Sequence, residues 1–187
     1  NLSGRQINQD SLIYDSTGRP HVLYAEQTTG QSNYSVFHAI KHGDSWNIST
    51  IAGPISSDRF DFALDSDGTP HVLYVSENGD LIHANQNETG WEYNVARSTN
   101  ATTDVREFSL ASGGNTVHIS YVIATRPAEN QFSPRNYSTW YGEYSSGQWQ
   151  QQRILLNSDD TRYDSIDIAA TETGTPHIVA EDGFHLQ

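Results

Sequence analysis

The sequence contains no cysteine and no methionine, and its single lysine is Lys41. Without cysteine the chain has no disulfides, iron–sulfur clusters, thiolate zinc sites or cysteine nucleophiles. The net charge of −13 argues against nucleic acid and against an anionic membrane surface as partners, since both need a basic patch. No uninterrupted apolar run reaches the roughly 18 residues of a transmembrane helix, so no membrane insertion is expected. No motif for a cofactor is present, and none is predicted.

A unit that predicts strand, turn and strand is repeated along the chain. Residues 61–74 read DFALDSDGTPHVLY, in which β-branched and aromatic residues flank a glycine turn. Related units recur at residues 11–24, 108–121 and 167–180. Each carries one histidine: His21, His71, His118 or His177. These histidines are 50, 47 and 59 residues apart, a period that is typical of a β-propeller. Gly68 precedes the histidine by three residues, and Asn115 in the third unit is expected to adopt the same left-handed conformation.

Two more strands are predicted after each unit, separated by a glycine turn that leads to a tryptophan. These tryptophans are Trp46, Trp91 and Trp149. Four strands per repeat make one propeller blade. We therefore predict an all-β fold, a small β-propeller of four four-stranded blades in a single domain over residues 1–187. The blades are expected at about residues 11–52, 60–97, 107–156 and 165–187, the last with residues 1–8 added.

The fourth repeat ends at Gln187, before its tryptophan and its fourth strand, while residues 1–8 precede the first blade. We predict that this N-terminal strand completes the last blade, which would hide both sheet edges. The strand is supplied in cis, or in trans from a neighbouring subunit, and exchange in trans would give a head-to-tail assembly of the chain with itself. A third possibility stays open, in which the chain is part of a larger propeller.

The repeated polar residues are interpreted as structural. One histidine per blade at the same phase favours packing, with each ring donating to a backbone carbonyl, over four metal ligands or general bases. The histidines of the third strands, His38, His83 and His185, receive the same interpretation, with Tyr141 in their place in the third blade. No metal site and no catalytic residue are predicted.

The acidic turns and the tryptophans are interpreted in the same way. Asp15 and Asp65 begin turns that faintly resemble calcium loops but have no closing glutamate. We expect each aspartate to cap its own turn by accepting hydrogen bonds from the following backbone N–H groups. The recurring tryptophans are expected to pack between blades.

The repeat symmetry is broken at residues 126–138, an insertion rich in proline and asparagine. Aromatic side chains in and beside this insertion suit the apolar faces of sugars, and a specific binding surface is expected where the symmetry is broken. The residues predicted to bind a glycan are Trp140, Tyr137, Phe132 and Arg135.

Sequons for N-glycosylation are dense. They occur at Asn1, Asn33, Asn47, Asn87, Asn100 and Asn136. Most fall in predicted loops or at strand edges, where a glycan is tolerated. We therefore expect a secreted or cell-surface glycoprotein.

The D-x-x-G-x-P-H unit, followed by an aromatic strand and a glycine–tryptophan turn, resembles the degenerate repeats of sialidase-like (BNR-type) β-propellers. The resemblance covers nearly the whole chain and implies the fold. It does not imply sialidase activity, because the S-x-D-x-G-x-T-W box is absent and no arginine triad is identifiable among the nine arginines. Some secreted propellers with similar repeats are polysaccharide lyases that use His and Tyr.

Three functions are therefore considered. The first is an extracellular, glycosylated structural or adhesive surface module, as a subunit of a larger assembly or filament. The second is a carbohydrate-binding, lectin-like propeller with glycans as partners. The third is a polysaccharide lyase or hydrolase.

Overall fold

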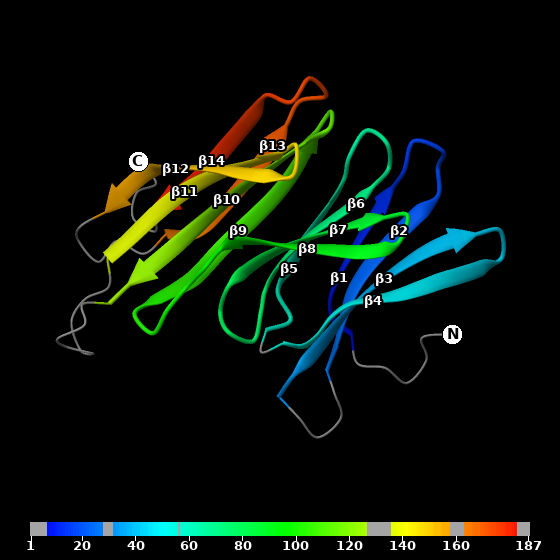
Figure 1. Ribbon diagram of the computed structural model, residues 1–187, viewed down its shortest axis with the longest axis horizontal. Helices are drawn as coiled ribbons and strands as arrows, with labels where there is room; N and C mark the ends of the chain where they lie inside the picture. The colour runs from blue at the N-terminus through cyan, green and yellow to red at the C-terminus, as the bar shows by residue number, and fades with distance from the viewer. Residues whose placement is uncertain (1–6, 28–31, 56, 127–135, 158–162, 183–187) are drawn as a thin grey trace.

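The computed structural model describes residues 7–27, 32–55, 57–126, 136–157 and 163–182. These residues form fourteen β-strands. Three sheets have four antiparallel strands each, hydrogen-bonded in chain order, and a fourth has two. Figure 1 shows the sheets side by side in chain order, from the blue first sheet to the orange and red fourth sheet. None of the described residues belongs to a helix of the length and apolarity needed to cross a bilayer.

The strands have the following bounds. The first sheet comprises β1 (Ile7–Tyr14), β2 (Pro20–Gln27), β3 (Tyr34–His42) and β4 (Ser45–Ile55). The second comprises β5 (Phe60–Leu64), β6 (Pro70–Val75), β7 (Leu81–Asn87) and β8 (Gly90–Arg97). The third comprises β9 (Thr103–Gly113), β10 (Thr116–Thr125), β11 (Asn136–Ser145) and β12 (Gln148–Asn157). The fourth comprises β13 (Tyr163–Ala170) and β14 (Pro176–Asp182).

Apolar side chains fill the space between successive sheets. Because side chains alternate along a strand, each inner strand buries one set against the sheet before it and another against the sheet after it. Leu23 and Phe62 belong to one core cluster between the first and second sheets. Leu73 and Leu110 belong to the next, and Val122 and Ile166 to the third. Successive meandering sheets that pack face to face are propeller blades, so the predicted all-β propeller fold is confirmed.

The N-terminal segment does not complete the last blade in its described part. Ile7 pairs with Glu26 and Gln9 with Ala25, so residues from Ile7 onward extend β1. β2 extends to Gln27, so its backbone N–H and C=O groups can pair with those of residues from Ile7 onward. The backbone groups of both strands are thereby hydrogen-bonded within the first sheet. The prediction of a closing strand is therefore wrong for Ile7 and Asn8. Residues 1–6 and 183–187 lie outside the described residues.

The first turn of the third blade is shorter than its counterparts. β9 and β10 pair as far as Gly113 and Thr116, which leaves a two-residue turn, whereas the equivalent turn of the second blade has five residues. This shift moves the left-handed position to Gly114, at φ 58°. The prediction that Asn115 adopts this conformation is wrong, since among the described residues other than glycine only Ser146 has a positive φ.

Candidate functional site

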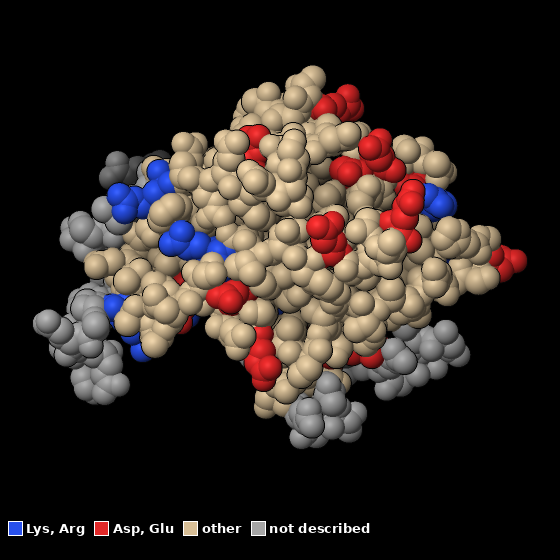
Figure 2. Space-filling view, in the orientation of Figure 1, with Lys and Arg blue, Asp and Glu red and all other residues tan. Residues whose placement is uncertain are grey.

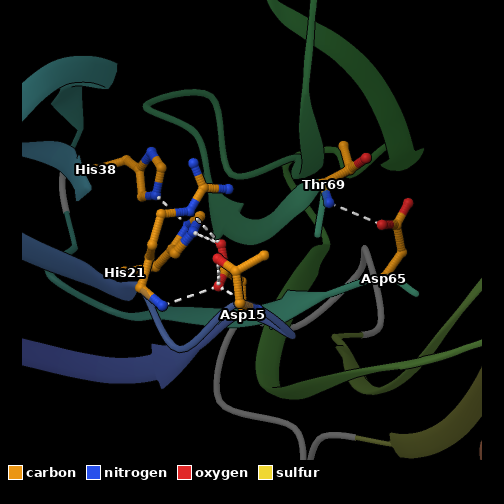
Figure 3. A network of polar contacts seen from close by, with 7 residues as sticks. Asp15, His21, His38, Asp65 and Thr69 are labelled. Atoms are coloured by element: carbon orange, nitrogen blue, oxygen red, sulfur yellow. Dashed lines mark hydrogen bonds and ion pairs between the residues drawn. The ribbon is translucent and has the colours of Figure 1, made fainter. Parts of the chain in front are cut away.

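A buried chain of polar side chains runs through the first sheet (Figure 3). Asp15 Oδ1 accepts hydrogen bonds from the backbone N–H groups of Thr17 and Arg19, each at 2.9 Å. Asp15 Oδ2 lies 3.5 Å from His21 Nε2, and His21 Nδ1 lies 3.1 Å from His38 Nε2. The aspartate thus caps its own turn, as predicted. The ring partner of His21 is another histidine rather than the predicted backbone carbonyl.

The second sheet repeats this arrangement. Asp65 Oδ1 accepts from the backbone N–H of Thr69 at 2.7 Å, and its Oδ2 lies 3.3 Å from His71 Nε2. His71 Nδ1 lies 3.0 Å from His83 Nε2, and the two rings stack with planes 8° apart. Repetition at the same register indicates a structural element of the blade.

Both networks are closed to solvent by the following blade. Trp91 of the second sheet meets His38 edge-on at 5.6 Å between centroids, and Trp149 of the third sheet meets His83 in the same way at 5.4 Å. Burial lowers the pKa of His38 to about 4 and that of His83 to about 3, so both rings are neutral at pH 7. The predicted packing of these two tryptophans between blades is confirmed. The third, Trp46, is instead 44% exposed.

The third sheet departs from the pattern. His118 Nδ1 lies 2.8 Å from Tyr141 Oη, which donates to Glu143 Oε2 at 3.2 Å. Tyr141 and Glu143 line a cavity of about 250 Å³ together with Gln150, Gln151 and Gln152. Burial, with Glu143 beside it, raises the pKa of Tyr141 to about 12. The phenol therefore stays protonated at neutral pH and is a poor general base.

A larger pocket of about 500 Å³ lies between the second and third sheets, at the ends of their strands. Its walls come from the loop after β6, the loop between β8 and β9, the start of β9 and the end of β10. The lining residues are Val75, Asn78, Gly79, Thr99, Asn100, Thr103, Asp104, Val105, Arg106 and Arg126. Three chain segments that are distant in sequence therefore bring planar polar side chains together.

Local hydrogen bonds hold the pocket loops in place. Thr99 N donates to Asp80 Oδ1 at 2.7 Å, which ties the β8–β9 loop to the second sheet. Asn100 Oδ1 accepts from the backbone N–H and the hydroxyl of Thr102, at 2.9 and 2.8 Å. Arg126 N donates to Thr102 O at 2.8 Å, which ties the end of β10 to the same loop. The walls are therefore set by the fold before any ligand binds.

Among the described residues that line the pocket, the charged groups are two guanidinium groups and one carboxylate. Arg106 Nη2 donates to Asp104 Oδ2 at 2.9 Å, and Arg126 supplies the second guanidinium. Arg106 Nε is buried and has no hydrogen-bond partner among the described residues. Of the Lys and Arg side chains visible on the face in Figure 2, most lie on the left of the view.

Of the residues predicted to bind a glycan, Trp140 and Tyr137 lie on opposite faces of β11. Trp140 stacks with Tyr121 at planes 8° apart, and the Arg97 guanidinium carbon lies 4.4 Å from the centre of its ring. Tyr137 is 9% exposed and packs with Val122 against the fourth sheet, on the opposite face of β11. Phe132 and Arg135 lie outside the described residues.

Sequence reasoning missed the pocket between the second and third sheets, because its residues are scattered over loops that carry no motif. Only the density of Asn and Thr near residue 100, and the arginines on either side, were visible signals. Of the predicted sequon asparagines, four are exposed: Asn47, Asn87, Asn100 and Asn136. Asn33 is half-buried, and Asn1 lies outside the described residues.

No protein-family model matches the chain, and no curated protein matches its sequence. Solved structures do. The α-L-arabinanase of Penicillium chrysogenum, complexed with arabinobiose, is similar over 95% of this chain, with a TM-score of 0.61 and 14% identity. The Aleuria aurantia lectin, in complex with Fucα1-6GlcNAc, is similar over 91%, with a TM-score of 0.52 and 12% identity. A bifunctional GH43-CE protein of Bacteroides eggerthii is similar over 95%, with a TM-score of 0.51 and 15% identity.

This chain spans 59% of the length of the arabinanase, 52% of the lectin and 23% of the bifunctional protein. At such low identities the similarity shows the fold alone. The fold it shows is the β-propeller type found in lectins and glycosidases, in agreement with the four successive sheets.

Proposed function

We propose that this chain is a carbohydrate-binding propeller module, and that the pocket between the second and third sheets takes an oligosaccharide with an anionic group. The observation that carries the proposal is the pocket lining, in which Asn, Thr, Asp and Arg side chains converge from three segments. Hydroxyl groups of sugars both donate and accept hydrogen bonds, and amide, carboxylate and guanidinium groups in fixed positions can match them.

The anionic character follows from the charge balance. Two arginines and one aspartate are the charged residues among the described lining of the pocket, although the chain as a whole carries a net charge of −13. A guanidinium group binds carboxylate or sulfate oxygens through paired hydrogen bonds, so uronic acids and sulfated sugars fit this lining. None of the described lining residues is aromatic, so stacking on a sugar face contributes less here than charge and hydrogen bonding.

The structural neighbours support the class of ligand. Their names include a lectin bound to a fucosylated disaccharide and an arabinanase bound to arabinobiose. Carbohydrate binding therefore has more support than the structural or adhesive role. We also propose a secreted or cell-surface location and a sialidase-like type of repeat, on the grounds of the sequons and the repeat motifs alone.

A polysaccharide lyase or hydrolase is the second candidate, and the His118–Tyr141–Glu143 cluster is the observation that favours it. The cavity beside this cluster has one carboxylate, Glu143, among its described lining residues. Glycoside hydrolysis ordinarily uses two. The raised pKa of Tyr141 also disfavours the phenolate that proton abstraction would need.

The test is a glycan array followed by calorimetric titration of the best acidic oligosaccharide and of its neutral counterpart. We expect binding of the acidic form, and a loss of affinity of about tenfold or more in Arg126→Gln, since one charge-assisted contact contributes about 1.4 kcal/mol or more. Arg153→Gln is the matched control, because Arg153 is exposed and does not line the pocket. Equal binding by the two variants, or no binding to any glycan, would overturn the proposal.

A further inference from the structure

The sequons that the structure describes differ in what the hydroxyl group of their third residue contacts. In two of them, which begin at Asn87 and Asn100, this hydroxyl belongs to a threonine and contacts the asparagine itself. Thr102 Oγ1 donates to Asn100 Oδ1 at 2.8 Å, and the backbone N–H of Thr102 donates to the same oxygen at 2.9 Å. Thr89 makes the same two contacts with Asn87 Oδ1, at 2.7 and 2.9 Å. Each of these sequons is therefore closed into a local turn.

Two other sequons lie in strands, and their hydroxyl groups have different partners. Asn47 belongs to β4 and Asn136 to β11, and each is paired with the neighbouring strand of its sheet. Ser49 Oγ, in the sequon of Asn47, accepts a hydrogen bond from the indole of Trp91 at 3.1 Å. Ser138 Oγ, in the sequon of Asn136, accepts one from an indole N–H of its own strand at 2.9 Å. In both, the hydroxyl bonds to an indole rather than to its own asparagine.

The turn at Asn100 fixes the orientation of its side-chain amide. A backbone N–H can only donate, so the amide atom that Thr102 N contacts is the oxygen, and the other atom is the nitrogen. Asn100 is exposed, and its Nδ2 has no hydrogen-bond partner among the described residues. Because the contacts with Thr102 span only two residues, the turn can form before the blades pack. Nδ2 of Asn100 is therefore accessible for modification.

Asn100 also lines the pocket between the second and third sheets, which Asn87 does not. Its loop is held beside the pocket, since Asn100 N donates to Thr103 Oγ1 and Arg126 N donates to Thr102 O, each at 2.8 Å. Arg126 is a lining residue of the same pocket. An oligosaccharide attached to Asn100 Nδ2 therefore starts at the pocket wall, whereas one attached to Asn87 starts in the hairpin between β7 and β8.

We propose that Asn87 and Asn100 are the described sequons that carry N-linked glycan, and that the glycan on Asn100 covers the pocket. In this modification a bond forms between Nδ2 and the anomeric carbon of a sugar. The bond between that carbon and the diphosphate of an activated sugar donor breaks, and one Nδ2 proton is released. The donor and the transferase belong to the secretory route of the cell. The glycan on Asn100 then regulates oligosaccharide binding, a consequence that rests on the proposed function.

The first test is glycopeptide mass spectrometry of the chain produced in a eukaryotic host that attaches N-linked glycans during secretion. We expect glycan at Asn87 and Asn100 in most molecules, and at Asn47, Asn136 and the half-buried Asn33 in few. Asn47 and Asn136 are the matched controls, because both are exposed like Asn87 and Asn100. Equal occupancy at all five sequons, or an unmodified Asn100, would overturn the proposal.

The second test measures the cover of the pocket without any ligand. Phenylglyoxal, which modifies guanidinium groups, is applied to the glycosylated wild type and to Thr102→Val, which loses the sequon but keeps Asn100. We expect Arg126 to react several-fold faster in Thr102→Val, while Arg153, exposed and outside the pocket lining, reacts equally in both. Ala101→Pro also removes the sequon and should give the same result. All three proteins from a host without N-glycosylation should react alike. Equal reaction of Arg126 in glycosylated wild type and variants would contradict the cover.

Calorimetric titration with the acidic oligosaccharide separates this inference from the proposed function. We expect the glycosylated wild type to bind about tenfold more weakly, or less, than glycosylated Thr102→Val. Thr89→Val, which removes only the sequon of Asn87, should bind as weakly as the wild type. Equal binding by the glycosylated wild type and Thr102→Val would overturn the regulation. No binding by the glycan-free chain would overturn the proposed function alone, since the reaction of Arg126 decides whether the pocket is covered.

Discussion

The second and third sheets differ in what lies beside their histidines, although they share strand order and register. In the second sheet, Asp65, His71 and His83 form a buried chain that Trp149 covers. In the third, His118 reaches Tyr141, whose neighbour Glu143 lines an open cavity. We infer that the repeated polar residues stabilise those blades in which the following blade covers them.

Lowering the pH should have the largest effect on stability, because the histidines buried in the first and second sheets must then bind protons. The pKa values of His38 and His83 in the folded state, about 4 and about 3, lie below the ordinary value of 6.5. The unfolded chain therefore binds protons that the folded chain excludes, and stability that is fully present above pH 6.5 is lost as the pH falls toward 4. We expect a loss of unfolding free energy on the order of 4 kcal/mol between pH 7 and pH 4.

Thermal denaturation across this pH range measures the effect. His83→Tyr, which places the residue of the third sheet in the second, should flatten the profile because one titrating ring is removed. His42→Gln serves as the control for replacing an exposed histidine, since His42 lies exposed at the end of β3. A wild-type melting temperature that stays constant from pH 7 to pH 4 would show that the two rings are not buried in the neutral form.

Substitutions that remove one polar group from each network should change the free energy of unfolding by a smaller amount. His83→Ala leaves His71 without its ring partner and a cavity beneath Trp149, so we expect a loss of unfolding free energy of about 3 kcal/mol. Tyr141→Phe leaves His118 without its hydroxyl partner but keeps the ring, so no cavity forms and the loss should be about 1 to 2 kcal/mol. Urea denaturation of both variants supplies the comparison. Equal losses would mean that the third network stabilises its blade as much as the second does.

Much of the fold could be predicted because the repeat places its signals in the same order each time. The unit around His71, the turn and Trp91 predicted the four strands of a blade, and the capping of the turn by Asp65 followed from local chemistry. What could not be predicted depends on distances between strands. His71 contacts His83 because β6 and β7 pair with Leu73 opposite His83. This register cannot be read from the sequence.

The site was harder to predict than the fold. Trp140 and Tyr137 are three residues apart, so on a strand they lie on opposite faces and cannot form one platform. The pocket instead joins Asn78, Asn100 and Arg126, which come from three loops whose approach depends on how two blades stack. Ile7 was assigned to the wrong strand because its local sequence is equally compatible with pairing in β1 and with pairing in a strand that closes the last blade.

The measurement that tests the account most directly is a backbone NMR titration of the chain with the best acidic oligosaccharide from the array. We expect amide shifts to concentrate at residues 75–79, 99–106 and 126, while the amides of His21, His38, His71 and His83 keep their shifts. Shifts that cluster instead at Tyr141, Glu143 and residues 150–152, or at the buried histidines, would contradict the assignment of the binding site to the pocket between the second and third sheets.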